Sequence, residues 1–270
     1  MYEPAWFHIG FRDVDLIQEA HKLYSGVNIQ ENLRNVEKSI RAACERADRK
    51  REDVCLVAVS KTRTPEEITA AIRAGVTDIG ENRVQEATRK KPLVPLDATW
   101  HLVGHLQTNK ARKALELFTV IQGLDSLHLA QEIQQRCLQQ DKKIRTLVEV
   151  NTSNEPTKFG VQPEQLGELL KDVLQLDRLE LAGLMTIGPG WAIEDPEASR
   201  PCFRLLSRLA EEARQRFGIP LPHLSMGMSS DFEQGIEEGA TVIRVGTAIF
   251  GPRAGHNPIP SSESELCPKP

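Results

Sequence analysis

The stretch VCLVAVSKTRTPEE, residues 54–67, decides the fold class of this chain. Its first half is a nearly continuous apolar run rich in valine, which is typical of a strand covered on both faces. Thr64 and Pro65 then open an expected helix that ends at Gly75, with proline at the first helical position. The turn between strand and helix contains no glycine, whereas an open doubly wound sheet wants a glycine-rich first turn. This first unit therefore favours a closed barrel over an open sheet.

The same alternation of a short apolar segment with a helical stretch continues to residue 246. No hairpin dipeptide joins the apolar segments, so consecutive strands should be parallel and connected by helices. Such units predict an α/β protein with a single (β/α)₈ TIM-barrel domain over residues 28–253, a fold that typically needs ~250 residues. The eight expected strands cover residues 54–60, 76–80, 99–104, 118–124, 145–151, 179–186, 223–226 and 241–246.

Helical periodicity is clearest in the stretch that precedes the first strand. Asn28 stands before apolar residues at helical spacing over residues 29–47, and Glu31 is placed to support that cap. Longer helical stretches also cover residues 126–140 and 195–218.

The two ends of the chain differ from this pattern. An N-terminal arm, residues 1–27, holds five of the 13 aromatic residues, so we expect it to pack, in a role that the pattern does not assign. Residues 254–270 are rich in proline and serine and predict a flexible tail.

The composition excludes several classes of protein. The 270 residues carry 34 Lys plus Arg against 38 Asp plus Glu, and this slight acidity argues against a nucleic-acid-binding protein. No apolar run approaches the ~20 residues that span a bilayer, and the N-terminus lacks the pattern of a secretory signal. The five cysteines show no CxxC spacing, which is typical of reduced thiols. We therefore expect a cytoplasmic protein that binds neither nucleic acid nor membranes.

Lys61 directly follows the first expected strand, at the end of the barrel where active sites lie. Burial disfavours the charged ammonium, and a neutral amine forms Schiff bases with aldehydes. The position alone also fits a solvated lysine beside a strand.

Polar residues and glycine after the last two expected strands indicate a phosphate site. Ser229, Ser230, Gly246 and Thr247 supply hydroxyls and backbone amides there. Barrels often bind phosphate in the loops after strands seven and eight. The serines could instead merely cap the helix that begins near Asp231, and the two interpretations can coexist.

An imine-forming lysine and a phosphate cradle would then face each other across the barrel mouth. The ligand that carries both an aldehyde and a phosphate is pyridoxal 5′-phosphate. Arg244 lies two residues before Gly246, so it shares a face of the strand and could reach the ring nitrogen. A guanidinium there would keep the pyridine unprotonated and weaken the cofactor as an electron sink. The alternative for Arg244 is an ion pair with a carboxylate inside the barrel.

The chain resembles the pyridoxal phosphate homeostasis protein family, the single-domain relatives of the alanine racemase N-terminal barrel. The resemblance covers about residues 28–253 and implies a fold-type III barrel. It also implies that Lys61 carries the cofactor as an aldimine, that Asn82 lies near the ring, and that Arg244 faces the ring nitrogen. The resemblance rests on AVSKT (58–62), IGENRVQEA (79–87), WHLVGHLQTNK (100–110) and LSMGMSSDFEQGIEEGATVIRVGTAIFGPR (224–253). His105 follows an expected strand at the mouth, and Met226 ends another. With them, the expected cofactor-binding residues are Lys61, Asn82, His105, Met226, Ser229, Ser230, Arg244, Gly246 and Thr247.

Two further side-chain patterns are weaker. His101 and His105 are four residues apart, but their segment predicts a strand and a turn, so they need not converge on a metal. We expect no metal site, with His105 at the mouth and His101 inside the barrel. Lys158 could reach the mouth as a second amine, but a solvated loop lysine is the better interpretation.

The same resemblance raises the choice between an enzyme and a carrier. The racemase relatives take their second catalytic base, a tyrosine, from a separate C-terminal domain. Here the only tyrosines, Tyr2 and Tyr24, precede the first strand, and residues after 253 are too few for such a domain. Without a covering domain water enters, and the desolvation that assists carbanion chemistry is largely lost.

We therefore expect a protein that binds and supplies pyridoxal phosphate (PLP) without robust turnover and has no catalytic residue of its own. PLP-dependent apo-enzymes are its possible partners. An open mouth does not require a partner subunit, so a monomer is expected. A PLP-dependent amino-acid racemase or decarboxylase, and a cofactor-free Schiff-base lyase, stay open as alternatives.

Overall fold

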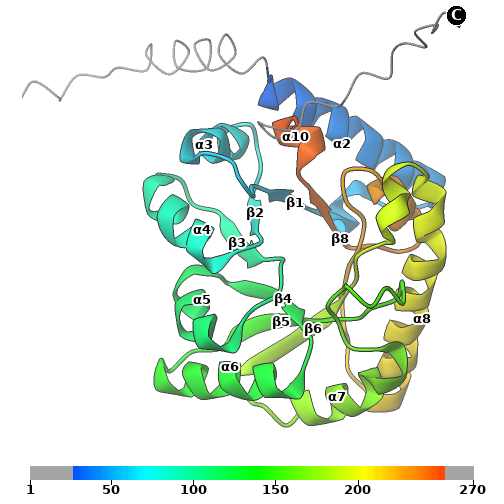
Figure 1. The fold of residues 1–270 in the computed structure, drawn as a ribbon. Helices are drawn as coiled ribbons and strands as arrows, with labels where there is room; N and C mark the ends of the chain where they lie inside the picture. The colour runs from blue at the N-terminus through cyan, green and yellow to red at the C-terminus, as the bar shows by residue number, and fades with distance from the viewer. Residues whose placement is uncertain (1–26, 253–270) are drawn as a thin grey trace, which may run out of the picture.

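A closed barrel of eight parallel strands forms the centre of the molecule, and helices surround it (Figure 1). The computed structural model describes residues 27–252, so the expectations for the arm and the tail fall outside the described residues, apart from Val27. The strands are hydrogen-bonded in chain order, and the last pairs with the first. The (β/α)₈ barrel predicted from the alternation is confirmed.

Each of the eight expected strands is present, with ends that differ from the prediction by at most two residues. The strands are β1 (Cys55–Val59), β2 (Asp78–Glu81), β3 (Thr99–Leu102), β4 (Val120–Leu124), β5 (Ile144–Glu149), β6 (Leu179–Met185), β7 (His223–Ser225) and β8 (Val242–Val245). Because all run in parallel, their carboxyl ends lie together at one end of the barrel, which we call the mouth.

Helices connect the strands, as expected for parallel neighbours. They are α2 (Ile29–Arg46), α3 (Pro65–Arg73), α4 (Val84–Lys90), α5 (Ala111–Leu117), α6 (Leu127–Gln139), α7 (Leu166–Val173), α8 (Arg200–Phe217), α9 (Phe232–Glu237) and α10 (Thr247–Phe250). Short 3₁₀ helices are η1 (Arg51–Asp53), η2 (Lys91–Leu93), η3 (Thr108–Lys110), η4 (Pro163–Gln165), η5 (Gly190–Ile193) and η6 (Pro196–Ser199).

The predicted helix starts are confirmed at two sites. The Asn28 side chain accepts from the Glu31 amide at 3.1 Å at the start of α2. Thr64 and Glu67 form a reciprocal capping box at the start of α3, with Pro65 as its first residue.

The hydrophobic core has an outer and an inner part. The main cluster lies between sheet and helices, and its largest fully buried side chains include Trp100, Phe203 and Phe250. Inside the barrel the apolar clusters are small, and Gln122 and Ser225 are among the buried polar residues there. Within residues 27–252, none of the helices combines the length and apolar character that a bilayer crossing requires.

Candidate functional site

The residues on both sides of Lys61 are held by α4. Lys90 donates from Nζ to the Ser60 carbonyl oxygen at 2.9 Å, and the Thr62 amide donates to Glu86 Oε2, also at 2.9 Å. Thr62 has a φ of +65°, which is rare for a β-branched residue. Such conformations persist only where their surroundings fix them, and they concentrate at functional sites. Lys61, itself half-buried, therefore occupies a firmly held turn at the end of β1.

A buried carboxylate at the end of β2 completes this support. Glu81 has no exposed surface, and its Oε1 accepts from Lys90 Nζ and from Ser60 Oγ, each at 2.7 Å. Its Oε2 has no hydrogen-bond partner among the described residues. Burial raises the pKa of Glu81 and outweighs the opposing hydrogen bonds from Lys90 and Ser60. This ion pair joins the ends of β1 and β2 to α4.

Two backbone amides after β8 converge on one oxygen atom. The Ser229 Oγ accepts from the Gly246 amide at 3.1 Å and from the Ala248 amide at 3.3 Å. Paired backbone amides are also the groups that bind a phosphate oxygen. Thr247, exposed, lies between these two amides in the chain, and Ser230, half-buried, directly follows Ser229. The four predicted phosphate residues are thus brought together in the loops after β7 and β8.

The alternative interpretation, in which the serines merely cap α9, is not supported. Asp231 holds the position before α9, yet its side chain makes no capping hydrogen bond to that helix. Its carboxylate accepts instead from the Met228 amide at 2.7 Å and from Ser199 Oγ at 2.5 Å. Ser229, as described above, binds amides at the start of α10.

The loops predicted to bind phosphate lie beside Lys61 and not across the mouth from it. Val245 on β8 pairs with Ala58 on β1, because the sheet closes on itself. A Cβ atom at Gly246 would come within 3.2 Å of the Val59 carbonyl oxygen, so glycine allows this close approach. The expectation that lysine and phosphate cradle face each other is therefore wrong.

Arg244 lies inside the barrel, with 4% of its surface exposed. It donates from Nη1 to Ser225 Oγ at 2.5 Å and from Nη2 to the Thr186 carbonyl oxygen at 2.7 Å. Its guanidinium therefore extends over β7 towards the end of β6. Burial lowers its pKa to about 10, against the opposing effect of Glu149 and Asp231. No ion pair joins Arg244 to a described carboxylate, so the alternative of an interior ion pair is wrong.

His105 and Asn82 lie at the mouth. The His105 ring places Nδ1 2.8 Å from Asp125 Oδ2 and stacks on Phe159, with ring centroids 4.0 Å apart. Asn82 is half-buried directly after β2. His101, in contrast, lies within β3 and binds Asp78 at 2.8 Å, so the prediction that it lies inside the barrel is confirmed.

The structure differs from the expectations for Met226 and for Lys158. The Met226 side chain is completely buried in the main hydrophobic cluster between sheet and helices, so only its backbone is available to a ligand at the mouth. Lys158 is not a solvated loop lysine. It pairs with Glu155 Oε1 at 2.6 Å and donates to the Gly188 carbonyl oxygen at 2.5 Å, which joins the loops after β5 and β6.

Sequence similarity relates the chain to one family of known proteins. A family model described as "Alanine racemase, N-terminal domain" matches residues 31–254. The pyridoxal phosphate homeostasis protein of Aquifex aeolicus is 45% identical over 228 residues, which cover 84% of this chain and 99% of the relative. The protein of the same name from Schizosaccharomyces pombe is 39% identical over 210 residues, 76% of this chain and 87% of the relative. The chain belongs to the pyridoxal phosphate homeostasis protein family.

Solved structures agree with membership of the pyridoxal phosphate homeostasis protein family. PipY of Synechococcus elongatus with PLP bound has a TM-score of 0.73 at 35% identity, covering 83% of this chain and 100% of that one. A Clostridium difficile alanine racemase has a TM-score of 0.66 at 16% identity, covering 88% of this chain and 59% of the racemase. The second likeness shows the fold alone.

Glu149 is a buried ionisable residue of this family member that the sequence analysis did not single out. It is the last residue of β5, 4% exposed, and burial together with the charge of Asp125 raises its pKa to about 7. The signal available in the sequence was a glutamate inside the apolar segment TLVEV. Lys90 was also missed, and its four-residue spacing from Glu86 was the only local signal. Among residues 27–252, no cluster of three or more histidine, cysteine or acidic side chains is arranged to hold a metal ion.

Proposed function

We propose that this member of the pyridoxal phosphate homeostasis protein family holds PLP through Lys61 and takes part in intracellular vitamin B6 homeostasis or supply, without robust catalytic turnover. The observation that carries the proposal is the adjacency of Lys61, after β1, and the amide pair at Gly246 and Ala248, after β8. In PLP the aldehyde and the phosphate arm are attached to neighbouring ring carbons. A ligand of that shape suits two neighbouring strand ends better than two opposite ones.

Arg244 fits the far side of the same ligand. The ring nitrogen of PLP lies across the ring from the aldehyde carbon. The Arg244 guanidinium extends away from β1 towards the end of β6, through its bond to the Thr186 carbonyl oxygen. A guanidinium has donors only, so facing the ring nitrogen it favours the unprotonated pyridine.

Each remaining group has a role in this arrangement. The Lys61 amine would add to the aldehyde to form a C=N bond with release of water, a step without redox change. Ser229, Ser230 and Thr247 would hold the phosphate together with the amides after β8. Asn82 and His105 would line the ring, and Met226 would contribute backbone only. When bound, PLP supplies an electron sink, which a neighbouring guanidinium weakens.

A weak PLP-dependent amino-acid racemase is the second candidate. His105 favours it, because its imidazole is 31% exposed at the mouth and bonded to Asp125, an arrangement that can carry a proton. A screen of amino acids for stereochemical exchange distinguishes the two. Rates no higher than those of PLP alone support the carrier, and substantially higher rates support the enzyme.

Trapping the imine tests the proposal. The purified protein with PLP should be yellow, and borohydride should attach the cofactor covalently to the peptide that contains Lys61. Lys61→Ala should abolish both the imine absorbance and the trapping. Lys158→Ala is the matched control, a partly buried lysine in the loop after β5, and should keep both. Colour that survives Lys61→Ala would contradict the proposal.

Supply to other proteins needs a separate experiment. The loaded protein is mixed with a PLP-dependent apo-enzyme and an aldehyde scavenger. Activation that outpaces scavenging would support direct transfer to that partner, whereas activation no faster than from PLP alone would support simple buffering.

A further inference from the structure

Behind Arg244, a row of buried side chains crosses the barrel interior. We infer that Gln122 is a positioning residue for Arg244, and that it fixes the direction of the guanidinium through Ser225. The inference rests on the proposed function, because it concerns the contact of Arg244 with the cofactor ring nitrogen. The row, which we call the interior chain, consists of Arg244, Ser225, Gln122, His101 and Asp78.

Four hydrogen bonds link the interior chain from β8 through β7, β4 and β3 to β2. Arg244 Nη1 lies 2.5 Å from Ser225 Oγ, and Ser225 Oγ lies 2.6 Å from Gln122 Oε1. Gln122 Nε2 lies 3.0 Å from His101 Nδ1, and His101 Nε2 lies 2.8 Å from Asp78 Oδ1. Ser225 and Gln122 at its centre are 0% and 1% exposed, so water does not compete for these bonds.

The direction of every bond in the interior chain follows from the chemistry of its members. Arginine has donors only, so Ser225 must accept from Arg244 and give its single proton to the Gln122 oxygen. This orients the Gln122 amide with its NH₂ group towards His101, whose Nδ1 must therefore accept. The ring proton then lies on Nε2 and is donated to Asp78.

Asp78 anchors the far end of the interior chain. Burial opposes its ionisation, but the hydrogen bonds from His101 and Thr77 prevail and lower the pKa of this carboxyl below its usual value. An ionised Asp78 accepts and cannot donate, which fixes the His101 tautomer. The order imposed at Asp78 is thus transmitted through His101 and Gln122 to Ser225.

The consequence for Arg244 is a fixed guanidinium plane. Its Nη1 is held by Ser225 and its Nη2 by the Thr186 carbonyl oxygen. Because the group is planar, two fixed donors determine where the other N–H bonds point. Turning away from Ser225 would leave buried polar groups unpaired, which is costly. Gln122 therefore sets the geometry at the ring nitrogen from the opposite wall of the barrel.

Two ligands that differ at one atom test this inference. The dissociation constants of PLP and of its carbocyclic analogue, in which C–H replaces the ring nitrogen, are measured for the unmodified protein, Gln122→Met, Arg244→Gln and the double variant. We expect the unmodified protein to prefer PLP, and Gln122→Met to weaken PLP by about tenfold while changing the analogue little. The double variant should bind PLP no more weakly than Arg244→Gln, because both changes remove one interaction.

A matched control and a second readout complete the test. Thr146→Val removes a buried hydroxyl of β5 that has no described partner, and it should change neither dissociation constant. Nitrogen NMR of the ligand-free protein should show the His101 proton on Nε2. Gln122→Met should leave it there, because Asp78 still accepts it, while shifting the Nδ1 resonance that loses its hydrogen-bond donor. If Gln122→Met does not fold, Gln122→Glu keeps the acceptor for Ser225 and should keep the preference for PLP while adding a proton to His101 Nδ1.

The outcomes separate this inference from the proposed function. A Gln122→Met variant that retains the preference for PLP, or effects that add in the double variant, would overturn the inference alone. An unmodified protein that forms no imine with PLP would overturn the proposed function and this inference with it.

Discussion

Lys90 Nζ lies 2.7 Å from Glu81 Oε1, in an ion pair whose carboxylate has no exposed surface. The same ammonium binds Glu86 at 2.8 Å and the carbonyl oxygen of Ser60 at 2.9 Å. Three oxygen atoms thus hold one lysine next to the turn that carries another. Lys90 stabilises the turn, whereas we propose that Lys61 reacts.

Removing Lys90 should destabilise the barrel strongly. Lys90→Met leaves Glu81 buried without its counter-ion, and breaking a buried pair in this way typically costs about 3–5 kcal/mol. Urea unfolding should show this loss in the free energy of unfolding. The double variant Lys90→Met with Glu81→Leu should recover most of it, because an apolar replacement of both charges is often neutral. A single variant with unchanged stability would show that the pair contributes nothing.

Glu149 should make the stability of the protein depend on pH. Burial and Asp125 raise its pKa from 4.5 to about 7, so the native state binds this proton more tightly than the unfolded state. The associated stability is present below about pH 4.5 and is lost as the pH rises through about 7. Over that interval Glu149→Gln should gain up to about 3 kcal/mol relative to the unmodified protein, as measured by urea unfolding. Parallel curves of stability against pH would contradict the assignment.

Much of the fold could be predicted because its signals are local. Apolar segments of four to eight residues alternate with helical stretches, and Asn28 and Thr64 form the expected caps. The rule that active sites lie at strand carboxyl ends then selected Lys61 and Arg244 for attention. The prediction that Lys61 and the loops after β7 and β8 face each other was wrong. In the linear sequence the first and last strands are far apart, whereas closure of the barrel makes them neighbours.

The support behind the site could not be predicted from local patterns. Ser225 and Gln122 share a hydrogen bond across 103 residues of sequence, and each is a polar residue within a short, mainly apolar segment. The side chain of such a residue could equally face solvent or form a hydrogen bond with a backbone group. Only the register of the closed barrel brings β4 and β7 residues together in its interior.

Ser229 should discriminate between phosphorylated and unphosphorylated vitamers. Ser229→Ala removes the hydroxyl that meets the Gly246 and Ala248 amides. PLP should bind about tenfold more weakly, because a hydrogen bond to a charged group is lost, whereas pyridoxal should bind unchanged. Titration of the imine absorbance with each vitamer measures both. Ser153→Ala, in the loop after β5, is the control, and equal weakening of both vitamers by Ser229→Ala would remove Ser229 from the phosphate site.

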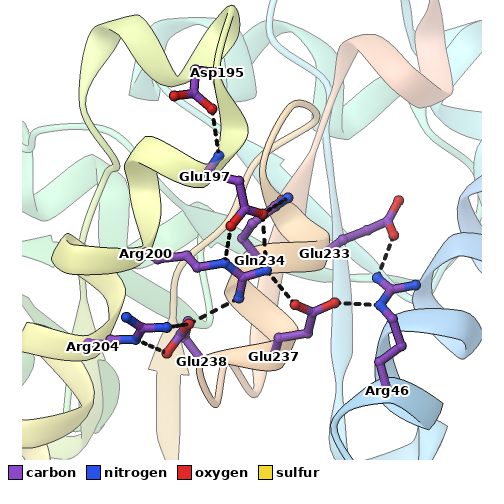
Figure 2. Close-up of polar contacts among 9 residues, drawn as sticks. All are labelled: Arg46, Asp195, Glu197, Arg200, Arg204, Glu233, Gln234, Glu237 and Glu238. Atoms are coloured by element: carbon purple, nitrogen blue, oxygen red, sulfur yellow. Dashed lines mark hydrogen bonds and ion pairs between the residues drawn. The ribbon is translucent and has the colours of Figure 1, made fainter.

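An ion-pair network holds α9, which directly follows the Ser229–Ser230 loop, between α2 and α8 (Figure 2). Arg200 on α8 binds Glu237 on α9 at 2.6 Å, Glu238 directly after α9 at 3.0 Å, and Glu197 on η6 at 2.6 Å. Arg46 on α2 reaches the same Glu237 from the other side at 2.6 Å. Arg200, Glu237 and Glu238 are mostly buried, so salt should screen the network less than it screens a surface ion pair, but more than it screens an ion pair in the protein interior.

Arg200→Met should therefore lower the free energy of unfolding by about 1–3 kcal/mol at low salt, and by less in ~1 M salt. The matched control is Arg208→Met on the same helix. Its pair with Glu212 spans 3.7 Å between side chains that are 68% and 63% exposed, and exposed pairs contribute only about 0–1 kcal/mol. Urea unfolding at both salt concentrations measures the difference, and hydrogen exchange should show faster opening of α9 in Arg200→Met alone. Equal losses in the two variants would mean that the network does not anchor α9, and that the loop carrying Ser229 is held by Asp231 and its bond to Ser199 instead.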